Sequence, residues 1–261
     1  MIQLTRDRGR VPAAFSAVKR TENEALLLGQ IAGGVFTFKS SIWKRAKTQI
    51  RAESGGKCAY CDAPTDVVAH GDVEHFRPKS VYWWLAYCYD NYLFACQICN
   101  QTHKGDNFPR AAVAMPAPTG PTPAGLAPDP IDAPGVKRFL TRCAGEKALL
   151  LDPYILDPEP LLKWVPDDTL REVQVEPRKK SGLGRTRAQT SIDGLGLNRE
   201  ELRFWRFRRY ESLAVFRAVF ETVTGSVRDL AETQLRRSME GGSEYAGMAR
   251  YFVRDEWELG L

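Results

Sequence analysis

The sequence has no long uninterrupted apolar run. Its most apolar stretch, Ala25 to Phe36, is broken by Gln30 and three glycines. It is far shorter than the roughly 20 residues that a helix needs to cross a bilayer. The first twenty residues also lack the apolar segment of a secretory signal. We therefore expect a soluble, cytoplasmic protein with no membrane partner.

Neither sign of charge is in large excess. The 261 residues contain 37 Lys and Arg against 32 Asp and Glu, a net charge of +5, and 43% of them are hydrophobic. This composition excludes collagen-like and wholly disordered chains, and it is sufficient for a packed core. The mildly basic balance permits a polyanionic partner without requiring one.

Cysteine and histidine are scarce but clustered. Six cysteines are too few for a disulfide scaffold, yet five of them and all three histidines lie between residues 58 and 103. Such clustering is typical of a metal or catalytic module. Cys88 and Cys143 have no partner at a ligand-like spacing, and we expect them to be small core residues. The histidines are His70, His75 and His103.

Cys58-Ala-Tyr-Cys61 and Cys96-Gln-Ile-Cys99 are two CxxC pairs separated by 34 residues. A two-residue spacer lets both thiolates face one point about 2.3 Å away, as tetrahedral zinc requires. Four cysteine ligands leave no open coordination position, so the pattern predicts a structural Zn²⁺ ion. A redox CxxC is the weaker interpretation, because a redox motif needs only one pair.

The 34 residues between the pairs hold the candidates for chemistry. Asp72–Phe76 alternates polar and apolar residues like a short strand, and residues 77–80 are typical of a turn. Glu74 and His75 place a carboxylate beside an imidazole, although strand alternation sends them to opposite sides unless the backbone bends. A lone histidine is usually a core or surface residue, but this one is accompanied in the sequence by Asn91, Asn100 and Lys104.

This set resembles the ββα-metal HNH endonucleases in their His-Asn-Asn variant. Eight residues separate Asn91 from Asn100, the usual interval in that motif. More narrowly, the chain resembles the HNH proteins of bacterial antiphage systems, the retron-associated and Septu-type nucleases, which work alongside a separate ATPase. The resemblance extends from about residue 38 to about residue 215 and is carried by CAYC, VEHFRPKS, DNYLFACQICNQTHKGDNFP, LLLDPY and GLNREEL.

The resemblance implies a role for each matching residue. His75 would be the general base that activates water, and Asn91 would orient it. Glu74 and Asn100 would hold one Mg²⁺ or Mn²⁺ ion, for which carboxylate and amide oxygens are suitable ligands. Many members have a histidine where this chain has Asn100, and His103, at a shifted position, could join or replace it as a ligand. The candidate phosphate contacts are Arg77, Lys79 and Lys104.

Helices are expected on both sides of this module. Residues 38–53 have apolar residues at helical spacing, with Ser40 or Ser41 as the cap and Gly55-Gly56 as the stop. Asn198 followed by Glu201 is typical of a capping box at the start of a helix with one buried face. A further helix is expected at residues 227–239.

The predicted fold is α+β and predominantly α, with a zinc-stabilised ββα-metal HNH core between helical regions. Its parts are an N-terminal helical region (1–57), the nuclease core (58–110), a Pro/Ala/Gly-rich linker or long loop (111–145) and a mainly helical C-terminal domain (146–261).

Two segments of the C-terminal half leave their roles open. Arg178–Arg187 is basic and punctuated by glycine, and it could touch a phosphate backbone, although a solvated loop is the stronger interpretation. The basic and aromatic run at 203–210 could position substrate or dock a partner ATPase. The same helices could instead simply support the nuclease.

The sequence as a whole predicts a metal-dependent endonuclease that hydrolyses phosphodiester bonds, with DNA as the expected substrate. We expect it to be the effector of an antiphage system with a separate ATPase. The alternative, a non-catalytic zinc-stabilised nucleic-acid-binding protein, explains the four cysteines but not the residues between them. A glycine-containing stretch at 33–40 lacks the glycine that precedes the lysine of a phosphate-binding loop, so no nucleotide site is expected in this chain.

Overall fold

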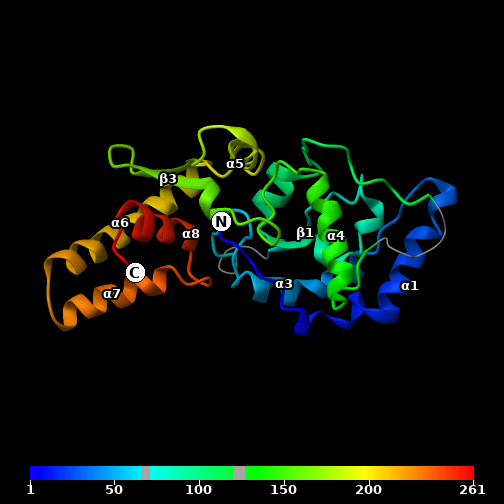
Figure 1. Ribbon diagram of the computed structural model, residues 1–261, viewed down its shortest axis with the longest axis horizontal. Coiled ribbons are helices and arrows are strands. Elements are labelled where there is room, and N and C mark those ends of the chain that lie inside the picture. The colour runs from blue at the N-terminus through cyan, green and yellow to red at the C-terminus, as the bar shows by residue number, and fades with distance from the viewer. Residues whose placement is uncertain (66–70, 120–126) are drawn as a thin grey trace.

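The computed structural model describes residues 1–65, 71–119 and 127–261; His70 lies outside the described residues. The fold is α+β, with helices predominating over two small sheets (Figure 1). The α-helices are α1 (Ala17–Leu28), α2 (Ser40–Trp43), α3 (Lys47–Glu53), α4 (Ala133–Gly145), α5 (Gly182–Gly194), α6 (Glu200–Thr222), α7 (Ser226–Ser238) and α8 (Ala246–Arg250). The strands are β1 (Asp72–His75), β2 (Tyr92–Ala95), β3 (Leu162–Asp167) and β4 (Glu172–Pro177), and two π-helical segments are η7 (Ile98–Lys104) and η9 (Tyr251–Glu256).

The first sheet is the hairpin of β1 and β2, and β1 confirms the short strand expected at 72–76 within the 34-residue spacer. The two strands are antiparallel, with Asp72 opposite Ala95 and His75 opposite Tyr92. The π-helical segment η7 begins three residues after β2 ends. The order of elements is therefore strand, strand, helix, with Asn91 just before the second strand and Asn100 in the helix that follows it.

The second sheet, the hairpin of β3 and β4, was not predicted within the mainly helical C-terminal region. Leu162 and Trp164 on β3 and Val173 and Val175 on β4 are buried, while their neighbours along each strand are more exposed. This is the period-two alternation of a strand with one buried face. The alternation of apolar and polar residues can be seen in the sequence, but it extends over only six residues in each strand.

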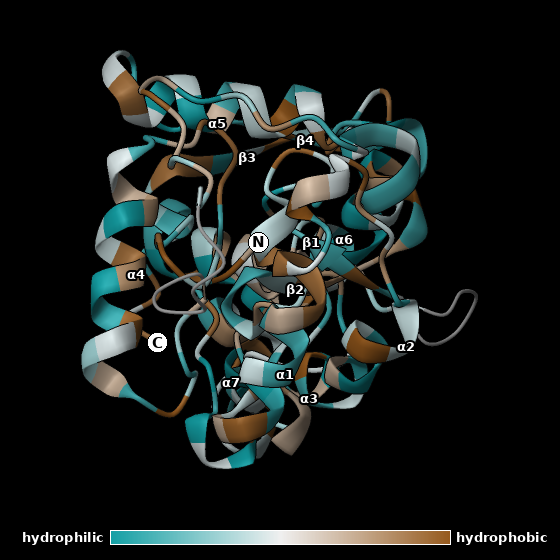
Figure 2. Cartoon of the chain, turned by 90° about the vertical axis from the view of Figure 1, so that its right-hand side faces the viewer, coloured by the Kyte–Doolittle hydropathy of each residue, from teal (hydrophilic) through white to brown (hydrophobic). Residues whose placement is uncertain are grey.

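The linker or long loop expected at 111–145 is wrong for its last part, because residues 133–145 form helix α4. The Asp132 side chain accepts a hydrogen bond from the Gly135 amide at 3.1 Å, and a proline stands in the first turn. Val136, Phe139 and Cys143 are buried at helical spacing. The high alanine and proline content of the segment concealed this periodicity, which is visible as alternating hydrophobic and hydrophilic residues along α4 in Figure 2.

The helix expected at 38–53 is confirmed as α2, a 3₁₀ turn at Lys44–Ala46 and α3. It ends as predicted, because Gly55 and Gly56 adopt positive φ angles of 63° and 75°. The serine cap is wrong: Lys39 is the N-cap residue, and no side-chain hydrogen bond caps the helix.

Helices α6 and α7 confirm the two predicted C-terminal helices, but the capping box is wrong. Arg199, not Asn198, is the N-cap residue of α6. The Asn198 amide instead accepts a hydrogen bond from the Val175 amide and donates one to the Val175 carbonyl, both at 2.8 Å. Val175 of β4 presents a backbone N–H donor and a C=O acceptor side by side. The Asn198 side chain has both an acceptor and a donor and bonds to both groups, whereas a helix N-terminus would use only its acceptor.

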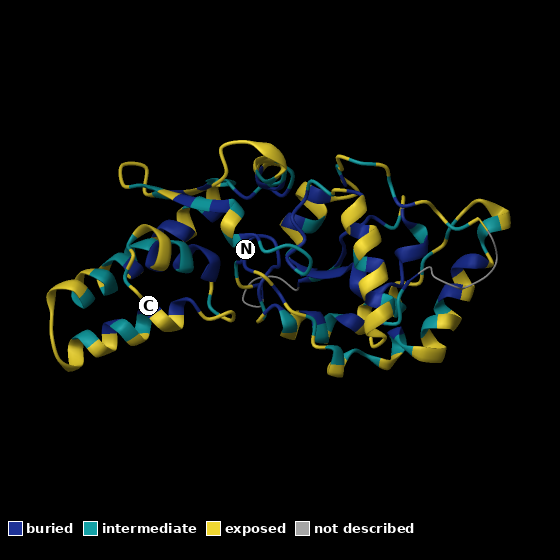
Figure 3. Cartoon of the chain, in the orientation of Figure 1, coloured by how far each residue is buried: buried dark blue, intermediate teal, exposed yellow. Residues whose placement is uncertain are grey.

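One hydrophobic core joins the expected regions. It contains Ile2 near the N-terminus, Phe76 between the cysteine pairs, Trp164 of β3 and Val253 of η9. Exposed residues gather instead on the outer side of α4 and at the far ends of α6 and α7 (Figure 3). Among the described residues, no helix has the length and apolar character needed to span a membrane.

Candidate functional site

The four cysteines of the two CxxC pairs lie together. Their sulfur atoms are within 4.8 Å of one another, and the Sγ atoms of Cys61 and Cys96 are 4.0 Å apart. Sulfur atoms bound to one tetrahedral zinc ion at about 2.3 Å would be separated by about 3.8 Å, so the cluster fits the predicted metal. It is the one such cluster of His, Cys, Asp or Glu ligand atoms within the described residues. Cys88 and Cys143 lie outside it and are buried, as predicted.

Arg199 lies beside this cluster, and the sequence prediction missed it. Its guanidinium donates a hydrogen bond to the Sγ atom of Cys99 at 3.5 Å and another to the Gly196 carbonyl at 3.1 Å. Four thiolates around Zn²⁺ carry a net charge of −2, which a neighbouring arginine offsets. The only signal in the sequence is that Arg199 belongs to the phrase GLNREEL.

The end of β1 brings four predicted site residues to one cavity of about 240 Å³. The strand supplies Glu74 and His75 as neighbours, and both line the cavity although strand alternation alone would separate them. Asn100 of η7 and Lys79 of the turn after β1 complete the set. The cavity thus lies between the first strand, its following turn and the helix that carries Cys99.

His75 is held in one orientation. Its Nε2 atom is 2.9 Å from the carbonyl oxygen of Ala86, and the edges of Trp43 and Tyr92 meet the ring at centroid distances of 5.1 Å. Burial lowers the pKa of His75 to about 4, so the imidazole is neutral at pH 7. A carbonyl can only accept a hydrogen bond, so Nε2 carries the proton and Nδ1 retains the lone pair.

Lys104 holds Glu74 in place through a buried ion pair. The Nζ atom of Lys104 is 2.6 Å from Glu74 Oε1, and the Tyr60 hydroxyl donates to the same oxygen at 3.3 Å. Burial raises the pKa of Glu74, and the Lys104 ammonium opposes that shift. Among the described residues these contacts involve Oε1, so Oε2 is the oxygen that a cation could take.

Lys104 is therefore not the phosphate contact that was predicted. Its side chain is fully buried. Besides Glu74, it donates to the backbone carbonyl of His75 at 3.2 Å. It joins η7 to β1 from the inside of the protein, where a phosphate backbone does not reach.

Arg77 is likewise a structural residue and not a phosphate contact. It is 2% exposed. Its Nε atom is 2.6 Å from Glu146 Oε2, and the Tyr82 hydroxyl donates to the other carboxylate oxygen at 2.6 Å. The guanidinium is thus committed to a buried ion pair at the end of α4.

Asn91 supports the turn after β1 and makes no direct hydrogen bond to the His75 ring in the described structure. Its amide accepts from the backbone amide of Arg77 and donates to the carbonyl of the same residue, both at 2.9 Å. The backbone carbonyl of Asn91 also accepts from the Phe76 amide at 2.9 Å. The predicted orienting role is therefore indirect: Asn91 fixes the backbone next to His75, and Ala86 fixes the ring.

Two predicted metal ligands on η7 face different sides. Asn100 lines the cavity with Glu74 and His75. His103 packs against Gly196, where an added Cβ atom would lie 2.3 Å from its ring. It lines a separate groove on the other side of η7, so His103 does not share the cavity with Asn100.

Lys44 and Lys47 are basic residues near the cavity that the sequence prediction did not single out. They line a second cavity of about 470 Å³, which shares Asn100, Gln101, Trp43 and Val73 with the first. The ammonium of Lys79 lies 5.6 Å from the centre of the Trp43 ring. The sequence contains one indication of this position. In the helix expected at 38–53, the apolar residues form one face, and Lys44 and Lys47 lie on the opposite, polar face.

The basic and aromatic run at 203–210 is divided between interior and surface. Arg206 is buried and donates to the Leu197 carbonyl at 2.7 Å, and burial lowers its pKa to about 10. Arg203 is paired with Glu172 at 2.7 Å. Arg208 remains at the surface, over the exposed ring of Trp205. Most of the run therefore supports the fold.

Comparison with known proteins identifies a similar protein in a Bacillus species. No protein-family model and no solved structure matches the chain. The Septu protein PtuB of Bacillus mycoides (strain KBAB4) is 30% identical over 142 residues, which cover 49% of this chain and 41% of that protein. The chain thus spans about two fifths of the length of the curated relative that it matches. This similarity agrees with the narrower of the two resemblances in the sequence, the one to Septu-type proteins.

Proposed function

We propose that this chain is a metal-dependent endonuclease of the HNH type that hydrolyses phosphodiester bonds, with DNA as its substrate. The observation that carries the proposal is the cavity shared by Glu74, His75 and Asn100. A neutral imidazole, a carboxylate and an amide meet there at the edge of a lysine-lined depression. Those groups are the ones that hydrolysis of a phosphodiester by an activated water requires.

His75 is the general base of the proposed reaction. Its ring is neutral at pH 7, and the hydrogen bond to Ala86 leaves the Nδ1 lone pair to take a proton from water. Trp43 and Tyr92 prevent the ring from turning. A base fixed in one tautomer and one orientation is typically worth a factor of about 10²–10⁴ in rate.

The donor set beside His75 fits a hard divalent cation. Glu74 offers Oε2 and Asn100 offers its amide oxygen, and Asp106 also lines the cavity. Mg²⁺ commonly takes one or two protein oxygens and keeps several waters, so the site needs no third side chain. When bound, Mg²⁺ or Mn²⁺ would supply positive charge that stabilises the scissile phosphate and the leaving oxygen. Lys104 keeps the Glu74 carboxylate in place for this role.

The substrate backbone would lie along the lysine-lined depression. Lys44, Lys47 and Lys79 line the two adjoining cavities, and lysine ammonium groups bind phosphate without reading sequence. Lys79 keeps its predicted role, and Lys44 and Lys47 take the place of Arg77 and Lys104 among the predicted contacts. Trp43, at the junction of the two cavities, provides an aromatic face against which a sugar or base could pack.

The similarity to PtuB supports placing this nuclease in a Septu-type antiphage system. We propose that it acts there as the effector and that a separate ATPase controls it. Co-purification of this chain with an ATPase encoded beside it would test that part of the proposal. Failure of the two proteins to associate would contradict it without affecting the nuclease assignment.

Cleavage of supercoiled plasmid by the purified protein tests the activity itself. With added Mg²⁺ or Mn²⁺ the protein should nick the plasmid, and His75→Ala should reduce the rate by about 10²–10⁴-fold with unchanged zinc content. Asn91→Ala is a useful comparison, since it should lower both activity and stability. Plasmid binding without cleavage at any divalent ion concentration would favour the non-catalytic zinc protein, and wild-type nicking by His75→Ala would reject His75 as the base.

A further inference from the structure

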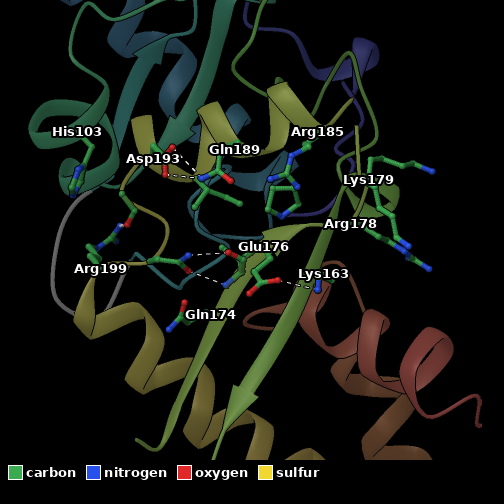
Figure 4. Close-up of a pocket in the computed structure, with 16 residues that line it drawn as sticks. His103, Lys163, Gln174, Glu176, Arg178, Lys179, Arg185, Gln189, Asp193 and Arg199 are labelled. Atoms are coloured by element: carbon green, nitrogen blue, oxygen red, sulfur yellow. Dashed lines mark hydrogen bonds and ion pairs between the residues drawn. The ribbon is translucent and has the colours of Figure 1, made fainter. Parts of the chain in front are cut away.

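A wide groove lies outside the proposed catalytic cavity. It has a volume of about 760 Å³ and is formed by the hairpin of β3 and β4, helix α5 and the start of α6 (Figure 4). His103 and Arg199 stand at one end of the groove, and Arg178 and Lys179 stand at the other. The proposed reaction uses none of these residues.

The lining of the groove is strongly basic. Six of its side chains are Lys or Arg and two are acidic, Glu176 and Asp193. Glu176 is paired with Lys163 at 2.9 Å, and Asp193 is bonded to Gln189. Both carboxylates therefore already have partners within the protein. The basic residues are Lys163, Arg178, Lys179, Lys180, Arg185 and Arg199.

Three of these residues carry most of the available charge. Lys179, Lys180 and Arg185 are exposed, and within the part of the chain that the structure describes no ion pair joins them to a carboxylate. They belong to the glycine-punctuated segment 178–187, for which the sequence left open a role in touching phosphate. The structure places that segment along the rim of a groove instead of on an isolated loop.

The shape and composition of the groove point to a chain of phosphates and not to a small nucleotide. Among the described residues, no Phe, Tyr or Trp lines it, whereas nucleotide sites are typically lined by apolar and aromatic side chains around the base. Lysine and arginine along an open groove bind the sugar-phosphate backbone irrespective of sequence.

The two sites share one short helix. Asn100 and Gln101 of η7 line the proposed catalytic cavities, and His103 of the same helix lines the basic groove. They lie within one turn of η7. One nucleic acid can therefore pass from the groove over η7 to Lys44 of the 3₁₀ turn and Lys47 of α3.

We propose that the groove between α5 and the β3–β4 hairpin binds the phosphodiester backbone of the substrate beyond the point of cleavage. This inference rests on the proposed nuclease function for the identity of the ligand. It assigns to Lys179, Lys180 and Arg185 the contacts that hold the nucleic acid, while Lys44, Lys47 and Lys79 serve the cleaved segment.

Binding of a fluorescein-labelled 40-base-pair DNA duplex, measured against salt concentration, tests the proposal. The His75→Ala protein without added divalent ion is used throughout, so that cleavage does not interfere. Lys179→Gln, Lys180→Gln and Arg185→Gln together should weaken binding and reduce the slope of log K against log salt by about 0.9 for each phosphate that the variant no longer neutralises. Lys137→Gln, Arg237→Gln and Arg254→Gln, which remove the same charge from exposed positions outside the groove, should leave the slope near that of the parent.

An unchanged slope in the groove variant, or an equal reduction in the control variant, overturns the proposal. So does a groove variant whose affinity falls for ATP but not for the duplex, because the groove would then be a nucleotide site. These results are distinguishable from failure of the nuclease function, which is measured separately as plasmid nicking by the protein with His75 intact. A protein that binds through the groove but never cleaves would retain this inference and lose the proposed activity.

Discussion

Arg77 and Lys79 are two residues apart and carry the same charge, but the fold uses them differently. Arg77 is buried in its ion pair with Glu146, while Lys79 is half-buried at the proposed catalytic cavity. Both were predicted as phosphate contacts, because a sequence shows the charge and not its partner. Glu146 is 69 residues from Arg77 along the chain, so no local pattern reveals the pairing.

This contrast gives a prediction at the scale of single residues. Arg77→Met should lower the free energy of unfolding by about 3–5 kcal/mol, because it leaves the Glu146 carboxylate buried without its partner. Lys79→Met should leave stability nearly unchanged and reduce the salt dependence of DNA binding by about 0.9 in the log–log slope. Urea denaturation and salt-dependent anisotropy measure the two effects. Equal effects of both substitutions on stability would contradict the division of roles.

The zinc cluster gives a second prediction at this scale. Cys58→Ser should lose the metal and much of the protein's solubility, since closing a structural zinc site contributes on the order of 10 kcal/mol in small zinc modules. Cys88→Ser is the matched control: it also replaces a buried cysteine, but one outside the cluster. Zinc content measured by mass spectrometry should fall only in Cys58→Ser, and full occupancy in a Cys58→Ser, Cys61→Ser double variant would reject the site.

At the scale of elements, local patterns predicted where helices and strands lie better than which residue caps the start of a helix. The helices at 38–53, 198–223 and 227–239 and the strand at 72–75 follow from short-range periodicity. The caps were wrong because the decisive contacts are non-local, as the bonds from Asn198 to Val175 show. Helix α4 and the β3–β4 hairpin were missed, because composition dominated the first and the second has only short strands.

The bridging role of Asn198 can be separated from a capping role by one substitution. Aspartate is as good an N-cap as asparagine, so Asn198→Asp would be harmless at a helix start. A carboxylate can accept from the Val175 amide but cannot donate to the Val175 carbonyl, and we expect a loss of about 1–3 kcal/mol in stability. Thermal denaturation of Asn198→Asp and Asn198→Ala measures this, and a wild-type midpoint for Asn198→Asp would restore the capping interpretation.

The same reasoning explains how much of the candidate site the sequence could predict. The four cysteines, Glu74, His75 and Asn100 were found together because their types and spacings are local and chemically specific. The possible ligand His103 and the predicted phosphate contact Lys104 do not line the cavity, because the register of the seven-residue π-helix decides which side chains face it. Lys44 and Lys47 were missed, since lysines on an exposed helix face are common and only the fold brings them to the site.

At the scale of the whole molecule, the expected C-terminal domain is not separable from the zinc module. Trp164, Leu197 and Met248 belong to the same hydrophobic core as Cys61. The backbone carbonyl of Asp62, next to that cysteine, accepts from the Tyr245 amide at 3.0 Å. The C-terminal half therefore completes the core on which the zinc cluster rests.

This packing predicts the outcome of truncation. A fragment ending at residue 145 should be insoluble or molten, because it exposes the apolar face that the second half covers. Charge reversal at buried Arg206 should likewise unfold the protein, whereas reversal at exposed Arg208 should not. Expression and near-UV circular dichroism of these variants provide the measurement. A soluble, zinc-loaded fragment 1–145 would show that the first half folds alone.

The seven residues of η7 include Cys99, a predicted zinc ligand, and Asn100, the amide proposed to bind the catalytic ion. They also include His103, which lines the basic groove, and Lys104, which is paired with Glu74. A chelator that removes zinc would release the start of this helix and disturb all of these positions together. Inhibition by EDTA would then look the same whether the reaction used a divalent ion or not. Dependence on Mg²⁺ must instead be measured by adding the ion back to protein whose zinc has been counted and found intact.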